Sequence, residues 1–302
     1  MFTKYSDEEY ANWRKASIIA AKAREYGRLL IKPGAKLLDV SEAVEDKIRK
    51  LGALPAFPAQ ISLNNTAAHN CADPNDTTIL EDQVIKLDCG AHIGGAVADN
   101  AVCVDLSGKW SDLIKASREA CLTASKVAGP GVCVTDVGRE IDRVIASYGF
   151  RAVRNLCGHG LAPFTVHTYP TIPNFDSGDD EILEEGMVIA IEPFATPGTG
   201  LVQEIDKANI FMFQKKKPVR SPYAREVLGE IELFQGLPFT TRWLSSKFSA
   251  AKLTLGLREL LAAGVIRQYP PLTEVSKNVV SQYENSWLIT ANGCELLTKG
   301  DE

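Results

Sequence analysis

The sequence predicts an α+β fold in which two related halves form an antiparallel sheet with helices on its outer face. The first observation is a hairpin signal between Lys86 and Val104, where two apolar-rich runs flank Gly94-Gly95. The second is the order of elements, because two helices, a strand region, the hairpin and two more helices precede a second β-rich half. The third is a helical stretch near residues 221–263 that interrupts this second half.

The first two elements are expected to be helices. Ser6 and Glu9 form a capping box, which predicts a long helix through about Leu30. Asp39 is expected to cap a second helix, which Gly52 ends. The buried faces should hold Trp13, Ile18, Ala21 and Ala23 in the first helix, and Val40, Val44, Ile48 and Leu51 in the second.

A partly polar segment links these helices to the hairpin. An extended run over 55–61 leads to His69, in a loop that ends with turn formers at 73–76. A lone histidine in a loop is usually solvated, so the local pattern leaves the role of His69 open. His92, close to the hairpin turn, is expected to be an exposed strand residue.

The hairpin register decides where two aspartates point. A turn at Gly94-Gly95 places Asp88 opposite Ala101. The same register places Asp99 opposite Gly90, so the aspartates are diagonal neighbours about 7–8 Å apart on one face. Because two buried carboxylates repel by roughly 4 kcal/mol at about 4 Å, a cation or a proton is expected between them, with Gly90 leaving room. Alternatively both aspartates are solvated, although Asp is depleted in strand interiors.

The elements after the hairpin are expected to be helical. Helices are predicted near Ser111–Val127 and Thr135–Tyr148, the second ended by a glycine. Farther along, the interrupting stretch contains helical patterns at 224–233, 239–244 and 252–263. These three segments are interpreted as a helical subdomain inserted into the second half.

The second β-rich half carries isolated polar groups. His159 and His167 are too far apart to share a helical face and instead bracket a glycine-flanked turn. The strand that holds Glu192 is apolar on both faces, so it should be central, and an ionised Glu192 at its end needs a partner. The alternative is that Glu192 marks an exposed strand tip. The last predicted strand, 279–290, carries Glu284 in an otherwise uncharged run.

Composition narrows the possible partners and compartments. The chain has 302 residues and a net charge of −5, with no long basic run beyond residues 215–217, which argues against nucleic acid as the main partner. Seven scattered cysteines without a CxxC pattern make a disulfide framework or zinc ribbon improbable, and reduced thiols indicate the cytoplasm. Neither a signal-peptide segment nor a membrane-spanning apolar run is expected.

The isolated polar groups of both halves suggest one metal centre. Four carboxylates and one imidazole carry a formal charge of −4, which two divalent cations would neutralise. Oxygen-rich ligation with a single imidazole favours Mn, Fe, Co or Zn over a thiolate zinc site. Two such ions can share a water, lower its pKa and polarise a carbonyl, which is the chemistry of amide hydrolysis. The five residues are Asp88, Asp99, His159, Glu192 and Glu284.

Short motifs across nearly the whole chain resemble those of the type 2 methionine aminopeptidases, in particular the archaeal form. They are AFP at 56–58, SLNNTAAH at 62–69, DTTIL at 76–80, KLDCG at 86–90, ADNAV at 98–102, GHGLAPFTVH at 158–167, IEPFAT at 191–196, RWL at 242–244, YPPL at 269–272 and QYEN at 282–285. This resemblance implies the pita-bread fold of creatinases and aminopeptidases over residues 1–302. It also implies a type 2 helical insertion over 213–272.

The resemblance also implies metal ligands. Two divalent ions, of Co, Fe, Mn or Zn, would be bound. The ligands it implies are Asp88 for one ion, His159 and Glu192 for the other, and Asp99 and Glu284 bridging both. Glu192 would in addition carry the proton during catalysis.

The residues that the resemblance implies at the substrate fall into two sets. His69 and His167 would flank the scissile amide and act in catalysis. Phe57, Val166 and Tyr269 would line the pocket for the methionine side chain, and a thioether suits such an apolar aromatic pocket. The implied activity is removal of the initiator methionine from nascent proteins with a small second residue, by a cytoplasmic monomer, at the ribosome or free of it.

Two rival functions share this fold. An Xaa-Pro peptidase is one, and the predicted insertion argues against it. A non-catalytic pita-bread protein that binds RNA or ribosomes is the other, but such relatives lack metal ligands and carry basic extensions. The chain departs from the family pattern at Thr168-Tyr169-Pro170, where Ala-Gly is usual after the histidine, and at Cys157, Ser286 and Trp287.

Overall fold

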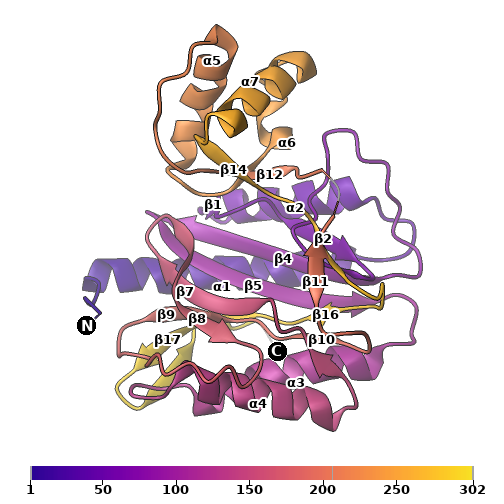
Figure 1. Cartoon of the computed structure of the whole chain (residues 1–302), viewed down its shortest axis with the longest axis vertical. Coiled ribbons are helices and arrows are strands. Elements are labelled where there is room, and N and C mark those ends of the chain that lie inside the picture. The colour runs from indigo at the N-terminus through magenta and orange to yellow at the C-terminus, as the bar shows by residue number, and fades with distance from the viewer. Residues whose placement is uncertain (1, 206, 301–302) are drawn as a thin grey trace.

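The computed structural model describes residues 2–205 and 207–300. Figure 1 shows a body of sheets and helices with a smaller, mostly helical lobe at the top. The first half of the body contains α1 (Asp7–Leu30), α2 (Leu37–Lys50), β1 (Leu54–Pro55), β2 (Gln60–Leu63), β3 (Thr66–Ala68), β4 (Val84–Ile93), β5 (Ala96–Asp105), α3 (Ser111–Val127) and α4 (Val134–Ser147). Both expected helix pairs are therefore present.

Local sequence signals explain where α1 and α2 begin. The capping box at Ser6 and Glu9 is formed, and α1 runs to Leu30 as predicted. Ile18 is 48% exposed, so its predicted place on the buried face is wrong. The predicted cap of α2 is also wrong, because the helix begins at Leu37 without a side-chain cap and Asp39 lies inside its first turn.

The central hairpin has the predicted register. Asp88 pairs with Ala101 and Asp99 with Gly90 across β4 and β5. On its other edge β4 pairs with β1 and β2, giving a sheet in which β4 is central. The helix α1 packs along β4 and β5 and covers one face of the hairpin, so the aspartates are held on a rigid, buried ribbon.

The second half forms a separate antiparallel sheet in the order β18-β17-β9-β7-β8. Its strands and the short strands beside it are β6 (Arg151–Ala152), β7 (Cys157–Ala162), β8 (Thr165–Pro173), β9 (Val188–Ile191), β10 (Phe194–Thr196), β11 (Val202–Glu204), β15 (Leu272–Glu274), β16 (Ser281–Gln282), β17 (Asn285–Thr290) and β18 (Gly293–Leu296). The predicted last strand is thus two strands, and a further strand, β18, follows it. The helices α3 and α4 pack beneath this half.

The two halves meet where the hairpin touches the C-terminal strands. Ala101 and Glu284 exchange backbone hydrogen bonds, with N···O distances of 3.1 and 3.2 Å. The Ser286 hydroxyl accepts from the Asp99 N–H at 2.8 Å and donates to the Asp99 carbonyl oxygen at 2.7 Å. These contacts place the carboxylate-bearing residues of both halves next to one another.

The lobe has its own small sheet and its own apolar core. Its elements are β12 (Ile210–Phe213), α5 (Pro222–Ile231), η1 (Glu232–Phe234), β13 (Phe239–Thr240), α6 (Thr241–Leu244), α7 (Ala250–Ala262) and β14 (Ile266–Tyr269). The predicted helix at 239–244 begins as a strand, because Phe239 and Thr240 pair with β12. A buried cluster around Phe211, Phe239 and Leu260 holds the helices together.

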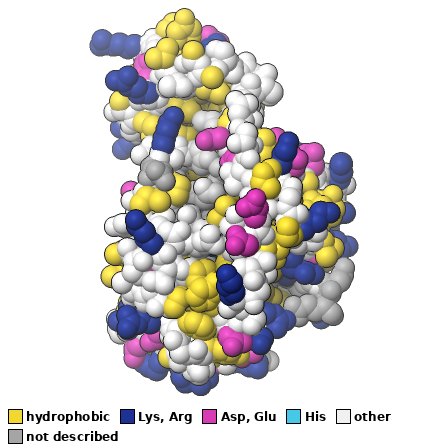
Figure 2. All heavy atoms as spheres, turned by 90° about the vertical axis from the view of Figure 1, so that its right-hand side faces the viewer, with side chains coloured by type: hydrophobic (Ala, Val, Ile, Leu, Met, Phe, Trp, Pro, Cys, Tyr) yellow, Lys and Arg dark blue, Asp and Glu magenta, His cyan; other side chains and the backbone are white. Residues whose placement is uncertain are grey.

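Three features concern the molecule as a whole. All seven cysteines are free thiols, as expected. Among residues 2–205 and 207–300, none of the helices combines the length and the apolar character that a bilayer span requires. Figure 2 shows Lys and Arg side chains scattered among acidic and neutral ones on one face.

Candidate metal centre

One pocket gathers every residue that the sequence predicted for the site. It has a volume of about 330 Å³ and lies where the two halves of the body meet the lobe. The predicted residues that line it are Phe57, His69, Asp88, Asp99, His159, Val166, His167, Glu192, Tyr269 and Glu284. Segments more than 200 residues apart in the chain therefore converge on one place, from Phe57 to Glu284.

The polar atoms at the floor of this pocket lie close enough to share an ion. Asp99, His159 and Glu284 each offer one ligand atom, and these atoms lie within 4.8 Å of one another. Nε2 of His159 is 3.8 Å from Oδ2 of Asp99 and 3.5 Å from Oε1 of Glu192. Asp88 lies on the neighbouring strand β4, diagonal to Asp99.

The space beside Gly90 differs from the prediction. A Cβ at this position would lie 2.4 Å from the ring of Phe57 and 2.7 Å from the carbonyl oxygen of Ala98. The glycine therefore makes room for the Phe57 ring and not for a cation. Gly90 therefore affects the site indirectly, because it lets the Phe57 ring approach the aspartates.

Several carboxylate oxygens of the site are buried without a hydrogen-bond partner. They are Oδ1 of Asp88, Oδ1 of Asp99 and Oε1 of Glu284. Within the described residues no lysine or arginine forms an ion pair with these groups or with Glu192. Burying a carboxylate without a partner costs several kcal/mol, on the order of the stability of a whole domain. Such a site needs protons or cations to be stable.

The pKa values of the four carboxyl groups reflect this environment. Burial raises the pKa of Asp88 to about 7. Burial, and then repulsion from neighbouring carboxylates, raises the pKa of Asp99, Glu192 and Glu284 well above their usual range. Without a cation, protons would therefore occupy the site near neutral pH.

His159 is prepared as a neutral ligand. Burial lowers its pKa to about 4. Its Nδ1 lies 3.2 Å from the carbonyl oxygen of Gly160. Because a carbonyl only accepts, Nδ1 carries the hydrogen and Nε2 keeps its lone pair directed at the carboxylates. One free imidazole nitrogen among orphaned carboxylate oxygens fits the donor set of a Mn, Fe, Co or Zn site.

Two further histidines border the pocket beside Tyr269. The ring centroid of His167 lies 4.4 Å from that of His159, and the His69 ring lies 5.3 Å from Tyr269. Loss of contact with water lowers the pKa of His69 to about 4. The same loss, followed by repulsion from His159, lowers the pKa of His167 well below its usual value. Both imidazoles are therefore neutral near pH 7 and can either donate or accept a hydrogen bond.

His69 is also held in an unusual backbone conformation. Its φ is +63°, in the left-handed region that non-glycine residues rarely adopt. Its N–H donates to Oε1 of Gln60 at 2.7 Å, which stabilises this conformation. Strain of this kind is concentrated at functional sites, and here it turns the imidazole of a loop residue into the pocket.

Sequence reasoning missed several residues around the centre. Arg267, Asn155 and Pro238 line the pocket. Behind the carboxylates, Nε2 of Gln282 donates to Oε2 of Glu284 at 3.4 Å. The alternation of a strand could have revealed Gln282, because it lies two residues before Glu284 and so on the same face.

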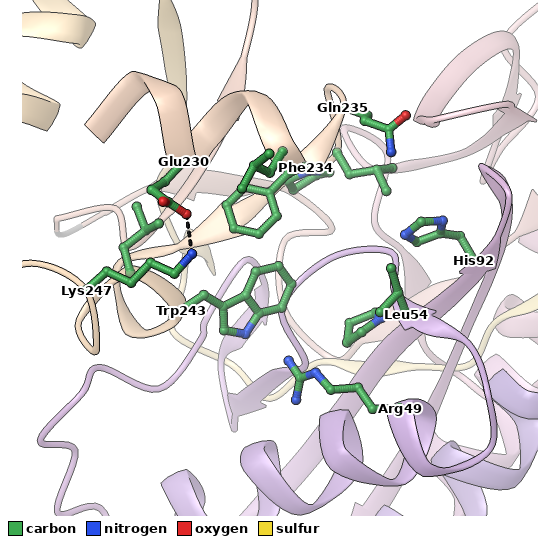
Figure 3. A pocket seen from close by; sticks show the side chains of 13 residues that line it. Arg49, Leu54, His92, Glu230, Phe234, Gln235, Trp243 and Lys247 are labelled. Atoms are coloured by element: carbon green, nitrogen blue, oxygen red, sulfur yellow. Dashed lines mark hydrogen bonds and ion pairs between the residues drawn. The ribbon is translucent and has the colours of Figure 1, made fainter. Parts of the chain in front are cut away.

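A second pocket of about 310 Å³ lies between the lobe and the body (Figure 3). Trp243, Phe234 and Leu54 form apolar walls, and Glu230 pairs with Lys247 at one end. His92 borders the other end and is only 8% exposed, so the prediction of an exposed residue is wrong. It is buried because its Nδ1 accepts from the Gly95 N–H and its ring packs against Phe164.

Buried carboxylates around a neutral imidazole, bordered by two more neutral imidazoles, define a metal-dependent hydrolase. The model of metallopeptidase family M24 matches residues 11–216. The methionine aminopeptidase of Archaeoglobus fulgidus is 46% identical over 89% of this chain and 91% of its own length. That of Methanocaldococcus jannaschii is 42% identical over 97% of this chain and 99% of its own. The chain therefore belongs to metallopeptidase family M24, among the methionine aminopeptidases.

Solved structures show the same fold at lower sequence identity. The methionine aminopeptidase of Thermotoga maritima superposes with a TM-score of 0.73 and 23% identity, covering 99% of this chain and 100% of its own. A thermophilic Arx1 superposes with a TM-score of 0.85 and 17% identity, covering 97% of this chain and 91% of its own. Together with the family match, they establish the predicted pita-bread fold.

Proposed function

We propose that this protein hydrolyses the peptide bond after an N-terminal methionine when the second residue is small, using two divalent metal ions. The observation that carries the proposal is the convergence of four carboxylates, two of them buried, and one neutral imidazole on a single pocket. The family membership supports the same activity, because the relatives named above are methionine aminopeptidases.

The ions would be held by side chains of both halves. Asp88 would bind one ion, and His159 with Glu192 the other. Asp99 and Glu284 would bind both, which agrees with their position between the two halves. When bound, two such ions polarise the scissile carbonyl and lower the pKa of a shared water. Four carboxylates at −1 each would balance two ions at +2 each.

Side chains of the protein would bind the scissile amide and transfer the proton. His69 and His167 are neutral, so each can donate a hydrogen bond to the scissile carbonyl or accept one from the amide without adding charge. Oε1 of Glu192 lies 3.5 Å from Nε2 of His159, at the edge of the pocket. From this position the Glu192 carboxylate would take a proton from the attacking water and pass it to the leaving amine.

The methionine side chain would lie against the apolar wall of the pocket. Phe57 and Val166 are buried on the body side, and Tyr269 comes from β14 at the edge of the lobe. A flexible, polarisable thioether gains favourable contacts with aromatic edges. Because the lobe supplies Tyr269, we propose that it is the type 2 insertion, with the predicted bounds 213–272.

The cellular setting belongs to the same proposal. A monomer in the cytoplasm, acting on nascent chains at the ribosome, would meet the substrate as it emerges. Seven free thiols agree with a reducing compartment. The scattered cations of Figure 2 and the net charge of −5 agree with the absence of a specific nucleic-acid partner.

The decisive experiment is hydrolysis of a Met-Ala-Ser peptide by metal-free protein reconstituted with Fe(II), Mn(II), Co(II) or Zn(II). Replacing Glu192 by Gln should lower kcat by about 10²–10⁴-fold, because the proton carrier is lost. Glu230→Gln is the matched control, since Glu230 is a carboxylate of the second pocket and should leave kcat unchanged. Full activity of Glu192→Gln would contradict the mechanism.

The same assay separates the two rivals. Cleavage of an Xaa-Pro peptide in preference to Met-Ala-Ser would assign the chain to the proline-specific members of the fold. A protein that binds fewer than one metal ion per chain and cleaves neither peptide would be a non-catalytic relative. The buried, unpaired carboxylates argue against this last outcome, because they are costly without a cation.

A further inference from the structure

The segment from β16 to β17, which carries Glu284, also carries two neutral polar side chains. Gln282 precedes Glu284 by two residues and Ser286 follows it by two. Ser286 binds the backbone of Asp99, so it fixes a strand. Gln282 instead contacts the carboxyl group of Glu284, and the proposed function gives it no role.

The amide of Gln282 lies behind Glu284, on a strand that packs against β4, which carries Asp88, and pairs with β10, which follows Glu192. Its Nε2 donates to Oε2 of Glu284 at 3.4 Å. Gln282 is 1% exposed and does not line the pocket, so it reaches the carboxylates from the protein side and not the substrate side.

The backbone holds this amide firmly in place. Gln282 pairs with Phe194 across β16 and β10, and Phe194 is two residues beyond Glu192. Its strand neighbour Ser281 donates to the carbonyl oxygen of Leu113 at 2.8 Å, which ties β16 to α3. The side chain of Gln282 therefore has a fixed origin from which to direct its N–H groups.

The neutrality of this amide matters for the charge of the centre. Four carboxylates at −1 balance two ions at +2, so a lysine or arginine in this place would leave an excess positive charge and weaken metal binding. A fifth carboxylate would add repulsion among buried anions. A carboxamide donates hydrogen bonds to the carboxylates and leaves the charge balance unchanged.

Gln282 also keeps a buried acceptor, Oε1, without a hydrogen-bond partner. Such an orphaned group costs about 1–3 kcal/mol of stability. An apolar side chain of equal length would avoid that cost if Gln282 only filled space. The cost is understandable if the N–H groups are needed by the metal-binding carboxylates.

We propose that Gln282 is a positioning residue that orients Asp88, Glu192 and Glu284 for metal binding and thereby sets the metal affinity of the protein. The inference rests on the proposed metal centre. Partners of this kind, which contact metal ligands but not the metal, change affinity by about 10–100-fold when they are removed. Gln282 touches no substrate, so its effect should appear in metal binding and not in the KM for the peptide.

The test compares Gln282→Met with Ser281→Ala. Methionine keeps the length of the side chain and removes both N–H donors, whereas Ser281→Ala loosens the same strand without touching the carboxylates. Metal-free proteins are titrated with Co(II) by calorimetry, and their absorption spectra and thermal midpoints are recorded. Gln282→Met should bind Co(II) about 10–100-fold more weakly and alter the Co(II) spectrum. Ser281→Ala should lower the thermal midpoint and keep the affinity of the wild type.

Three outcomes separate the hypotheses. Wild-type Co(II) affinity and spectrum in Gln282→Met would overturn the inference, and so would an equal loss of affinity in Ser281→Ala. If the wild-type protein itself binds no Co(II), the proposed function fails before Gln282 is tested. If Gln282→Met does not fold, Gln282→Asn decides, because its shorter amide keeps the donors but cannot reach the carboxylates and should show the same loss.

Discussion

The two pockets described above have nearly the same size, but they differ in whether their charged groups are paired. One measures about 330 Å³ and the other about 310 Å³, and Pro238 lines both. In the larger pocket, oxygens of Asp88, Asp99 and Glu284 are buried without partners. In the pocket of Figure 3, Glu230 pairs with Lys247, and Arg49 pairs with Asp46 at 3.0 Å.

The difference shows that shape alone does not identify the functional site. A cavity with satisfied charges is stable as it stands and requires no ligand. A cavity floored by uncompensated carboxylates is stable only when protons or cations occupy it. The unpaired carboxylates, and not the volume, therefore distinguish the pocket of the metal centre from the second pocket.

The largest expected effect comes from comparing one histidine of each pocket. His69→Ala should lower kcat/KM for Met-Ala-Ser by about 10²–10⁴-fold, because a neutral imidazole beside the scissile amide is lost. His92→Ala removes an imidazole that lines only the second pocket, so kcat/KM should stay unchanged while the thermal midpoint falls. Equal losses of activity in both variants would mean that the two pockets act as one site.

A second prediction concerns a buried ion pair beside the second pocket, next to Trp243. Glu45 is buried between α2 and the lobe, where it accepts from Arg242 at 2.5 and 3.0 Å and from Trp243 at 2.7 Å. Glu45→Gln leaves Arg242 as an uncompensated buried charge and should destabilise the protein by about 3–5 kcal/mol. Urea unfolding would measure the loss. The exposed Glu42 lies on the same helix, and Glu42→Gln should leave stability unchanged.

The sequence predicted the local features of the fold and the site better than the long-range ones. The hairpin register follows from Gly94-Gly95 alone, so the positions of Asp88 and Asp99 were predicted correctly from the residues. The predictions for His159, Glu192 and Glu284 named single polar groups in apolar strands. That all five groups meet in one place followed only from charge balance and from the resemblance to a known family.

The failures have a common physical cause. His92 and Gly90 were interpreted from the hairpin alone, yet Phe164 covers one and Phe57 fills the space beside the other. Those aromatic rings come from distant segments, so local pattern could not place them. Gln282 was missed although it lies two residues before Glu284, because a neutral amide carries no charge signal of its own.

The third prediction concerns protons at the metal centre. In the metal-free protein the raised pKa of Asp88 gives stability that is present below about pH 4 and lost as pH rises through about 7. Metal ions must displace these protons, so affinity should fall by about 1.4 kcal/mol per pH unit below 7 for one carboxyl. The rise in thermal midpoint on adding Mn(II) should therefore be larger near pH 8 than near about pH 5.5. An equal rise at both pH values would show that the centre holds no protons to displace.

The smallest expected effect tests whether the second pocket is independent of the first. Lys247 is 52% exposed and pairs with Glu230, so Lys247→Met should cost no more than about 1 kcal/mol. Because Lys247 does not line the pocket of the metal centre, Co(II) affinity and kcat/KM should match the wild type. A change in either would have to pass through Pro238, the residue that the two pockets share. Such a change would show that the second pocket influences the pocket of the metal centre.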